Sequence, residues 1–244
     1  MREILEDAAI TYRQEAENFL LVAAPAIVLG PVLVLMSAAG LKAALISIPL
    51  LLMLYVAVYA ASVRAAGLVL SNAEPEPAAS YLGVLWKAHS VIRAAIPGAL
   101  LAALAWGAYL GIQHFGQPIV VAAAGIGGAT ALFFWAAHHV YDLPLILCHG
   151  VGTADAGRIG RGLAARQPDP APALLLLVST PLLLAVLLTP LLGALVRPAF
   201  GSVVFAAAFG LWLPYCALCL ASSCDRLVRE AAAADSGRRT RIAG

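Results

Sequence analysis

The sequence predicts an all-α, polytopic membrane protein with six transmembrane helices. Hydrophobic residues make up 62% of the chain and charged residues only 11%, and the mean hydropathy is +0.92, whereas soluble domains carry about 25% charged residues. Between its charges the chain has six apolar runs, each close to the roughly twenty residues that cross the hydrocarbon layer. These runs are Phe19–Leu41, Ala43–Val63, Ala94–Ile112, Pro118–Tyr141, Ala171–Val196 and Pro198–Cys224.

Short links join the first run to the second, the third to the fourth and the fifth to the sixth, which predicts three antiparallel hairpins. A cytoplasmic amphipathic surface helix is predicted before each hairpin, within residues 2–18, 80–93 and 153–166. This pattern is an internal repeat of roughly 75 residues. We therefore predict one transmembrane domain over residues 1–225, with repeat units at about 1–70, 71–141 and 142–225, and a basic cytoplasmic tail over 226–244.

The surface helices are predicted from apolar stripes at helical spacing. The first two surface helices each have a stripe of four residues. The stripe of the second helix covers a narrower arc, and Lys87, Ser90 and Arg93 point away from it. The third has a thinner apolar side. The stripes are Ile4, Leu5, Ala8 and Tyr12; Tyr81, Leu85, Ala88 and Ile92; and Ile159 with Leu163.

Lysine and arginine are distributed unevenly across the predicted membrane. Of the 15 such residues, all but Lys42 and Arg197 fall on one side, and the positive-inside rule makes that side, with both termini, cytoplasmic. The acidic residues fall on the same side. No charged residue lies in the middle of a predicted span, so every ionised side chain is expected in water. Ion-coupled carriers usually keep such charges, and their absence argues against that class.

The glycine-rich stretch CHGVGTADAGRIGRG raises the possibility of a phosphate-binding loop. A P-loop needs lysine and a hydroxyl after its last glycine, but Arg158 and Ile159 follow Gly157, and no strand precedes the loop. The stretch instead predicts a turn at the membrane surface. Its basic residues, and those before the third span, are predicted to contact anionic lipid headgroups or to dock a protein partner. These residues are Lys87, Arg93, Arg158, Arg161 and Arg166.

A second polar cluster lies in the segment HHVYDLPLILCHG. On a continuous helix His138 and Asp142 share a face, and with His139 and His149 they form a conceivable metal site. The segment lacks an H-E-x-x-H motif, and Pro144 interrupts the helix that would direct the ligands. Interfacial histidines often cap helices or meet headgroups instead. The metal site therefore stays an alternative, and no cofactor is predicted.

Small residues predict close packing of the third and fourth spans. Gly107 and Gly111 are four apart in the third, and Gly125 and Gly128 lie in the glycine- and alanine-rich part of the fourth. Such residues let helix backbones approach closely within lipid.

Two stretches, EILEDAAITYRQEAENFLLVAAPAIVLGPVLVL and LPLILCHGVGTADAGRIGRGLAARQPDP, resemble a six-helix membrane-domain family. That family is fused to some glycerophosphodiester phosphodiesterases and also occurs as stand-alone bacterial and archaeal proteins. The chain has GRIGRG where the family usually has a helix of the Ala-Leu-Arg-Arg-Ser type, and it contains no phosphodiesterase domain. The resemblance implies a prokaryotic cytoplasmic-membrane module without an assigned activity. The matching residues are Leu143, Pro144, Leu145, Gly150, Ala156, Arg158 and Arg161.

These observations favour a non-enzymatic scaffold or accessory subunit, and we identify no catalytic residues. Its expected partners are membrane lipids, through anionic headgroups on the cytoplasmic face, and a possible membrane protein complex; nothing points to nucleic acid. A transporter for an apolar or lipid-like substrate is the second hypothesis. A metal- or cofactor-binding membrane subunit is the third.

Overall fold

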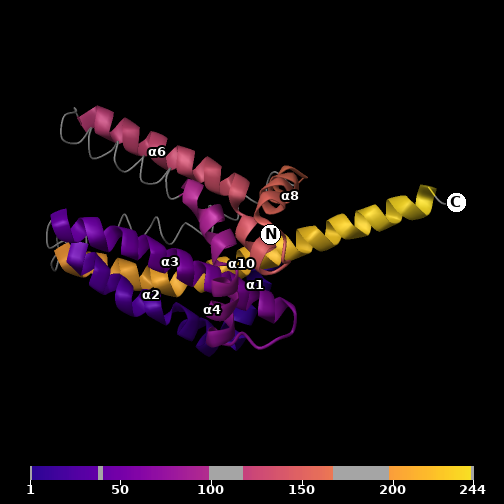
Figure 1. Cartoon of the computed structure of the whole chain (residues 1–244), viewed down its shortest axis with the longest axis horizontal. Coiled ribbons are helices and arrows are strands. Elements are labelled where there is room, and N and C mark those ends of the chain that lie inside the picture. The colour runs from indigo at the N-terminus through magenta and orange to yellow at the C-terminus, as the bar shows by residue number, and fades with distance from the viewer. Residues whose placement is uncertain (1, 38–40, 99–117, 167–197, 243–244) are drawn as a thin grey trace.

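The computed structural model describes residues 2–37, 41–98, 118–166 and 198–242, and all regular structure in these ranges is helical (Figure 1). This agrees with the predicted all-α class. A further helical stretch covers residues 88–98. The helices are α1 (Arg2–Gln14), α2 (Ala16–Ser37), α3 (Leu41–Leu70), α4 (Pro77–Trp86), α6 (Pro118–His139), α7 (Asp142–Leu147), α8 (Thr153–Arg166) and α10 (Pro198–Ile242).

Three of the described helices are long and apolar enough to cross a membrane. Their spans are Ala16–Met36 in α2, Pro49–Leu70 in α3 and Ala207–Ala234 in α10. They overlap the first, second and sixth predicted spans. The fourth predicted span coincides with α6, which has 22 residues. Most of the third span and all of the fifth lie outside the described residues, so the number six stays a prediction.

Helices α2, α3 and α10 pack side by side and form the core of the molecule (Figure 1). Within α3 the stretch 60–66 is buried on nearly every side, because α2, α4, α7 and α10 all contact this helix. Alanine dominates the stretch, which lets the neighbouring helices come close. Ser62, which is also buried, donates its hydroxyl hydrogen to the carbonyl of Val58 at 2.8 Å, so the core holds no unpaired group there.

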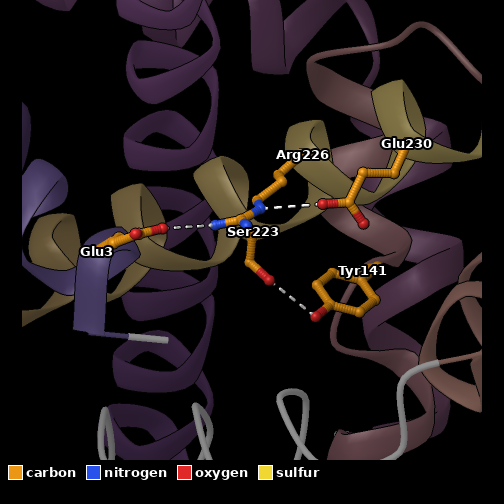
Figure 2. Close-up of polar contacts among 5 residues, drawn as sticks. All are labelled: Glu3, Tyr141, Ser223, Arg226 and Glu230. Carbon is orange, nitrogen blue, oxygen red and sulfur yellow. Dashed lines mark hydrogen bonds and ion pairs between the residues drawn. The ribbon is translucent and has the colours of Figure 1, made fainter. Parts of the chain in front are cut away.

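Helix α1 lies against the core through the face that the sequence predicted. Ala8 is buried, and the hydroxyl of Tyr12 donates to the carbonyl of Leu211 in α10 at 3.2 Å. Figure 2 shows a further link, in which Arg226 of α10 binds Glu3 at 3.3 Å and Glu230 at 3.0 Å. The apolar stripe of α1 therefore packs on protein.

The predicted surface helix over 80–93 is broken at Lys87, where α4 ends and the next helical stretch begins. Its packed face also differs from the prediction. Leu85 and Ile92, expected in the buried stripe, are 68% and 56% exposed, whereas Val84 and Val91 are buried. Val84 and Val91 are seven residues apart, so both helical pieces bury a face displaced by one residue from the predicted stripe, and the contact of α4 with α3 selects this face.

The fourth predicted span ends earlier than expected. Helix α6 stops at His139, and α7 begins after two intervening residues, at Asp142. The second of these residues, Tyr141, is fully buried, and its hydroxyl makes a 3.0 Å hydrogen bond with Ser223 of α10 (Figure 2). Pro144 does not prevent helix formation, because it lies in the first turn of α7, where a missing N–H is tolerated.

Of the three predicted hairpins, only the first has both of its helices within the described residues, and its link, residues 38–40, lies outside them. Helices α2 and α3 are separated by three residues in the chain and pack along each other (Figure 1). In the second, residues 88–98 reach α6 at Gly98, where an added Cβ would lie 2.3 Å from a ring carbon of Trp135. Gly107 and Gly111 lie outside the described residues. Gly125 and Gly128 lie in α6, and their predicted packing role is untested.

Helix α10 continues without a break to Ile242 and extends well beyond the core (Figure 1). Its 45 residues span about 67 Å at 1.5 Å per residue, roughly twice the hydrocarbon thickness. The predicted basic tail therefore begins as a continuation of the last helix.

Candidate functional site

A cavity of about 360 Å³ opens where five helical segments meet. Its walls come from α3, residues 88–98, α6, the junction leading into α7, and α10. Most of the described lining residues are aliphatic residues or glycine, and four have side chains with polar atoms. The aliphatic and glycine residues are Leu52, Val56, Ala94, Ala95, Gly98, Ala136, Val140, Leu143 and Leu220; the others are Tyr59, Trp135, His139 and Asp142.

The elements place these residues by helical periodicity. Leu52, Val56 and Tyr59 are spaced by four and three residues, so they share one face of α3. Trp135, Ala136 and His139 share a face of α6 in the same way. The volume and the apolar walls are typical of small-molecule sites, which are mostly hydrophobic with a few fixed polar groups.

His139 and Asp142 are a hydrogen-bonded pair among the described lining residues of the cavity. The Nδ1 atom of His139 lies 2.7 Å from Oδ2 of Asp142. The imidazole also stacks on the ring of Trp135, with centroids 5.1 Å apart and an interplanar angle of 26°. The ring is thus fixed by both a hydrogen bond and a stacking contact.

Asp142 corrects the expectation that every charged side chain lies in water. The residue is only 7% exposed, and its Oδ1 atom has no hydrogen-bond partner among the described residues. Burial raises the pKa of Asp142, and the hydrogen bond from His139, the charge of His139 and the charge of Arg161 oppose that shift. A buried carboxylate with one unpaired oxygen is costly, which makes it a candidate functional group.

The glycines of α8 allow this helix to lie against the carboxylate. A Cβ added at Gly160 would lie 2.8 Å from Oδ1 of Asp142, and one at Gly157 would lie 3.7 Å from Oδ2. Any side chain at Gly160 would therefore displace the acid or the helix. The GRIGRG sequence lies within the surface helix predicted over 153–166, and in α8 it forms the face that covers Asp142. Gly150, with a φ of +70°, supplies the turn itself.

Two cationic side chains bind the C-terminal end of α7. Lys87 donates from Nζ to the carbonyl of Ile146 at 2.6 Å, and Arg64 donates from Nη1 to the carbonyl of Leu147 at 2.9 Å. These are carbonyls of the last turn of α7, where a positive charge is favourable. Burial and, secondarily, Arg64 lower the pKa of Lys87. The expectation that Lys87 points away from the packed face is wrong, because its ammonium group binds protein.

The other predicted surface cations lie on the exterior where they are described. Arg93, Arg158 and Arg161 are exposed, and Arg158 pairs with Asp155 of its own helix at 3.0 Å. Arg166 ends α8, and its side chain is outside the described atoms. Headgroup contact by these residues stays a prediction.

The predicted metal ligands do not converge. His138 contacts the carbonyl of Phe134 at 2.7 Å, and His149 lies 3.9 Å from Asp225, away from the His139–Asp142 pair. Within the described ranges, no three His, Cys, Asp or Glu side chains are grouped as metal ligands. The predicted pairing of His138 with Asp142 is wrong because α6 ends at His139, which places the second histidine beside the acid.

Sequence reasoning identified His139 and Asp142 but missed Tyr59, Trp135 and the cavity itself. Trp135 stands four residues before His139, a spacing that stacks side chains on one helix face. That spacing was the available signal for Trp135. For Tyr59 the sequence contains no such signal, since the place of this residue in the cavity depends on how α3 lies relative to α6 and α10.

Comparison with models of protein families, with curated proteins and with solved structures found no match.

Proposed function

We propose that this chain is a non-enzymatic, multi-pass membrane protein that binds an apolar or lipid-like molecule in the cavity between α3, α6 and α10. The observation that carries the proposal is the cavity of about 360 Å³, whose described lining is mostly aliphatic and includes the hydrogen-bonded pair His139 and Asp142. An amphiphile matches that division, because its chain fits apolar walls and its polar end needs a fixed partner.

The sequence-based expectations extend this proposal. Six spans, with both termini in the cytoplasm of a prokaryote, would place α8 at the inner surface, and the exposed Arg93, Arg158 and Arg161 are suited to anionic headgroups there. Membership of the six-helix membrane-domain family is part of the same proposal, as is a role as an accessory subunit of a membrane complex. A bound lipid could stabilise such an assembly without any chemical step.

The test is whether a lipid-like molecule co-purifies through the cavity. We would extract the protein with a lipid-retaining polymer, wash it into mild detergent, and identify retained molecules by mass spectrometry. Ala136→Phe fills the cavity, and Ala131→Phe is a matched control because it adds the same ring at an exposed position of α6. We expect the wild type and A131F to retain the molecule at a fixed ratio and A136F to lose it. Equal retention by all three would contradict the proposal.

A further inference from the structure

We propose that the cavity selects an apolar molecule carrying a hydroxyl group, and that His139 accepts a hydrogen bond from this hydroxyl through Nε2. The inference rests on the proposed function and adds the class of ligand. Asp142 acts as a positioning residue, because it is argued to act through His139.

The contact between His139 and Asp142 assigns the imidazole proton. An ionised carboxylate oxygen can only accept a hydrogen bond, so in the neutral form of His139 the 2.7 Å contact places the ring hydrogen on Nδ1. Nε2 then carries a lone pair and is an acceptor. Within the described residues no hydrogen bond reaches Nε2, and His139 lines the cavity. The stacked ring of Trp135 holds this acceptor in a fixed orientation.

The charges around the pair discriminate among ligands. A phosphate or carboxylate would bring a negative charge near the buried Asp142, and the lining residues that the structure describes include no lysine or arginine to balance it. Arg161 is exposed on α8, the helix that covers the acid. A plain hydrocarbon would fit the walls but leave Nε2 unpaired, which costs free energy in an apolar site. A neutral hydroxyl group adds no charge near Asp142 and can donate a hydrogen bond to Nε2.

Trp135 provides a reporter inside the cavity. Bromine quenches tryptophan fluorescence on contact, so we would replace the other three of the four tryptophans by phenylalanine and titrate the purified protein. The probes are 2-bromododecan-1-ol, 2-bromododecane and ionised 2-bromododecanoic acid, which carry bromine on the same carbon and differ only in the group at carbon 1, the end expected at His139. We expect the alcohol to saturate the quenching at a concentration roughly two- to tenfold lower than the other two, as the gain of one hydrogen bond predicts.

Variants assign the preference to a residue. His139→Asn keeps a donor toward Asp142 and removes Nε2, so the three probes should become equal. Asp142→Asn can donate to Nδ1 and move the ring proton to Nε2, which should reduce the preference for the alcohol over the acid; a purely structural role would weaken all probes alike. Tyr59→Phe removes the one hydroxyl group among the described lining residues and should leave the preference intact.

The outcomes separate this inference from the proposed function. If A136F does not reduce saturable quenching by any probe, the cavity is not a binding site and both proposals are wrong. If A136F abolishes quenching but the wild type binds the three probes equally, only the hydroxyl assignment is wrong. Loss of the alcohol preference in Y59F but not in H139N would also overturn it, because Tyr59 would then be the anchor.

Discussion

Replacing Gly160 by alanine tests whether α8 rests on the Asp142 carboxylate. The added Cβ would lie 2.8 Å from Oδ1, while carbon–oxygen contacts normally settle at about 3.3–3.6 Å. Asp142 cannot easily retreat, because its other oxygen is held by His139 at 2.7 Å. Such overpacking costs about 1–3 kcal/mol. Alanine is also more favourable than glycine inside a helix by about 0.5–1 kcal/mol. A control variant must correct for this gain in helix stability.

Gly162→Ala is that control. Gly162 lies in the same helix, and a Cβ added there meets no atom within 4 Å. G162A therefore gains the helix term alone, and the difference between the variants isolates the overpacking. At about 2–4 °C per kcal/mol, G160A should melt roughly 2–12 °C below G162A. The assay is the temperature at which monodisperse protein disappears in detergent.

Making the same substitution in an Asp142→Ala variant shows whether the added methyl group strikes the carboxylate or another neighbour. Asp142→Ala removes the atom that the new methyl group would strike, so G160A should cost much less in D142A than in the wild type. If G160A is as stable as G162A, or is equally destabilising with and without the carboxyl group, then α8 does not rest on Asp142.

Three further predictions concern the fastening of α7, the titration of Asp142 and the topology. Lys87→Met should destabilise the protein by about 1.5–3 kcal/mol, because a charged donor to Ile146 is lost, whereas Arg226→Met, at an exposed ion pair, should have a smaller effect in the same melting assay. The folded-state pKa of Asp142 is raised, so its contribution to stability is present at acid pH and is lost as pH rises through that pKa. The melting temperature of the wild type minus that of D142N should therefore fall as pH increases from about 4, and a flat difference would exclude this titration. With the native cysteines removed, Arg158→Cys should react with an impermeant maleimide only after cells are permeabilised, and Lys42→Cys should react in intact cells; the reverse pattern would invert the topology.

The sequence predicted the helical class and several helices because local patterns determine them. Apolar length indicated α2, α3 and α10, and the stripe containing Ala8 and Tyr12 indicated α1, whose face packs as expected. The face of α4 was not predictable in the same way. Leu85 and Val84 are equally apolar, and only the position of α3 decides that Val84 is buried.

The site was predictable only in its local part. The histidines and the acid stand close in the chain, but whether His138 or His139 meets Asp142 depends on the residue at which α6 ends. That end is set by tertiary contacts, including the hydrogen bond of Tyr141 with Ser223, 82 positions away. The role of Gly160 required the same knowledge, since the sequence shows a glycine but not the carboxylate that it accommodates.

The charges near α7 have two different physical roles, which composition alone does not distinguish. The last carbonyl groups of a six-residue helix have no hydrogen-bond donors within the helix itself, so the end of α7 requires donors from elsewhere. Arg64 of α3 and Lys87 at the end of α4 supply them. These two cations are thereby committed to holding the segment that begins with Asp142. Arg93, Arg158 and Arg161 remain exposed, and we propose headgroup contact for them. Neutralising the first pair should therefore alter the cavity and its ligand preference, whereas neutralising Arg93 and Arg158 should alter headgroup selection and leave the cavity unchanged.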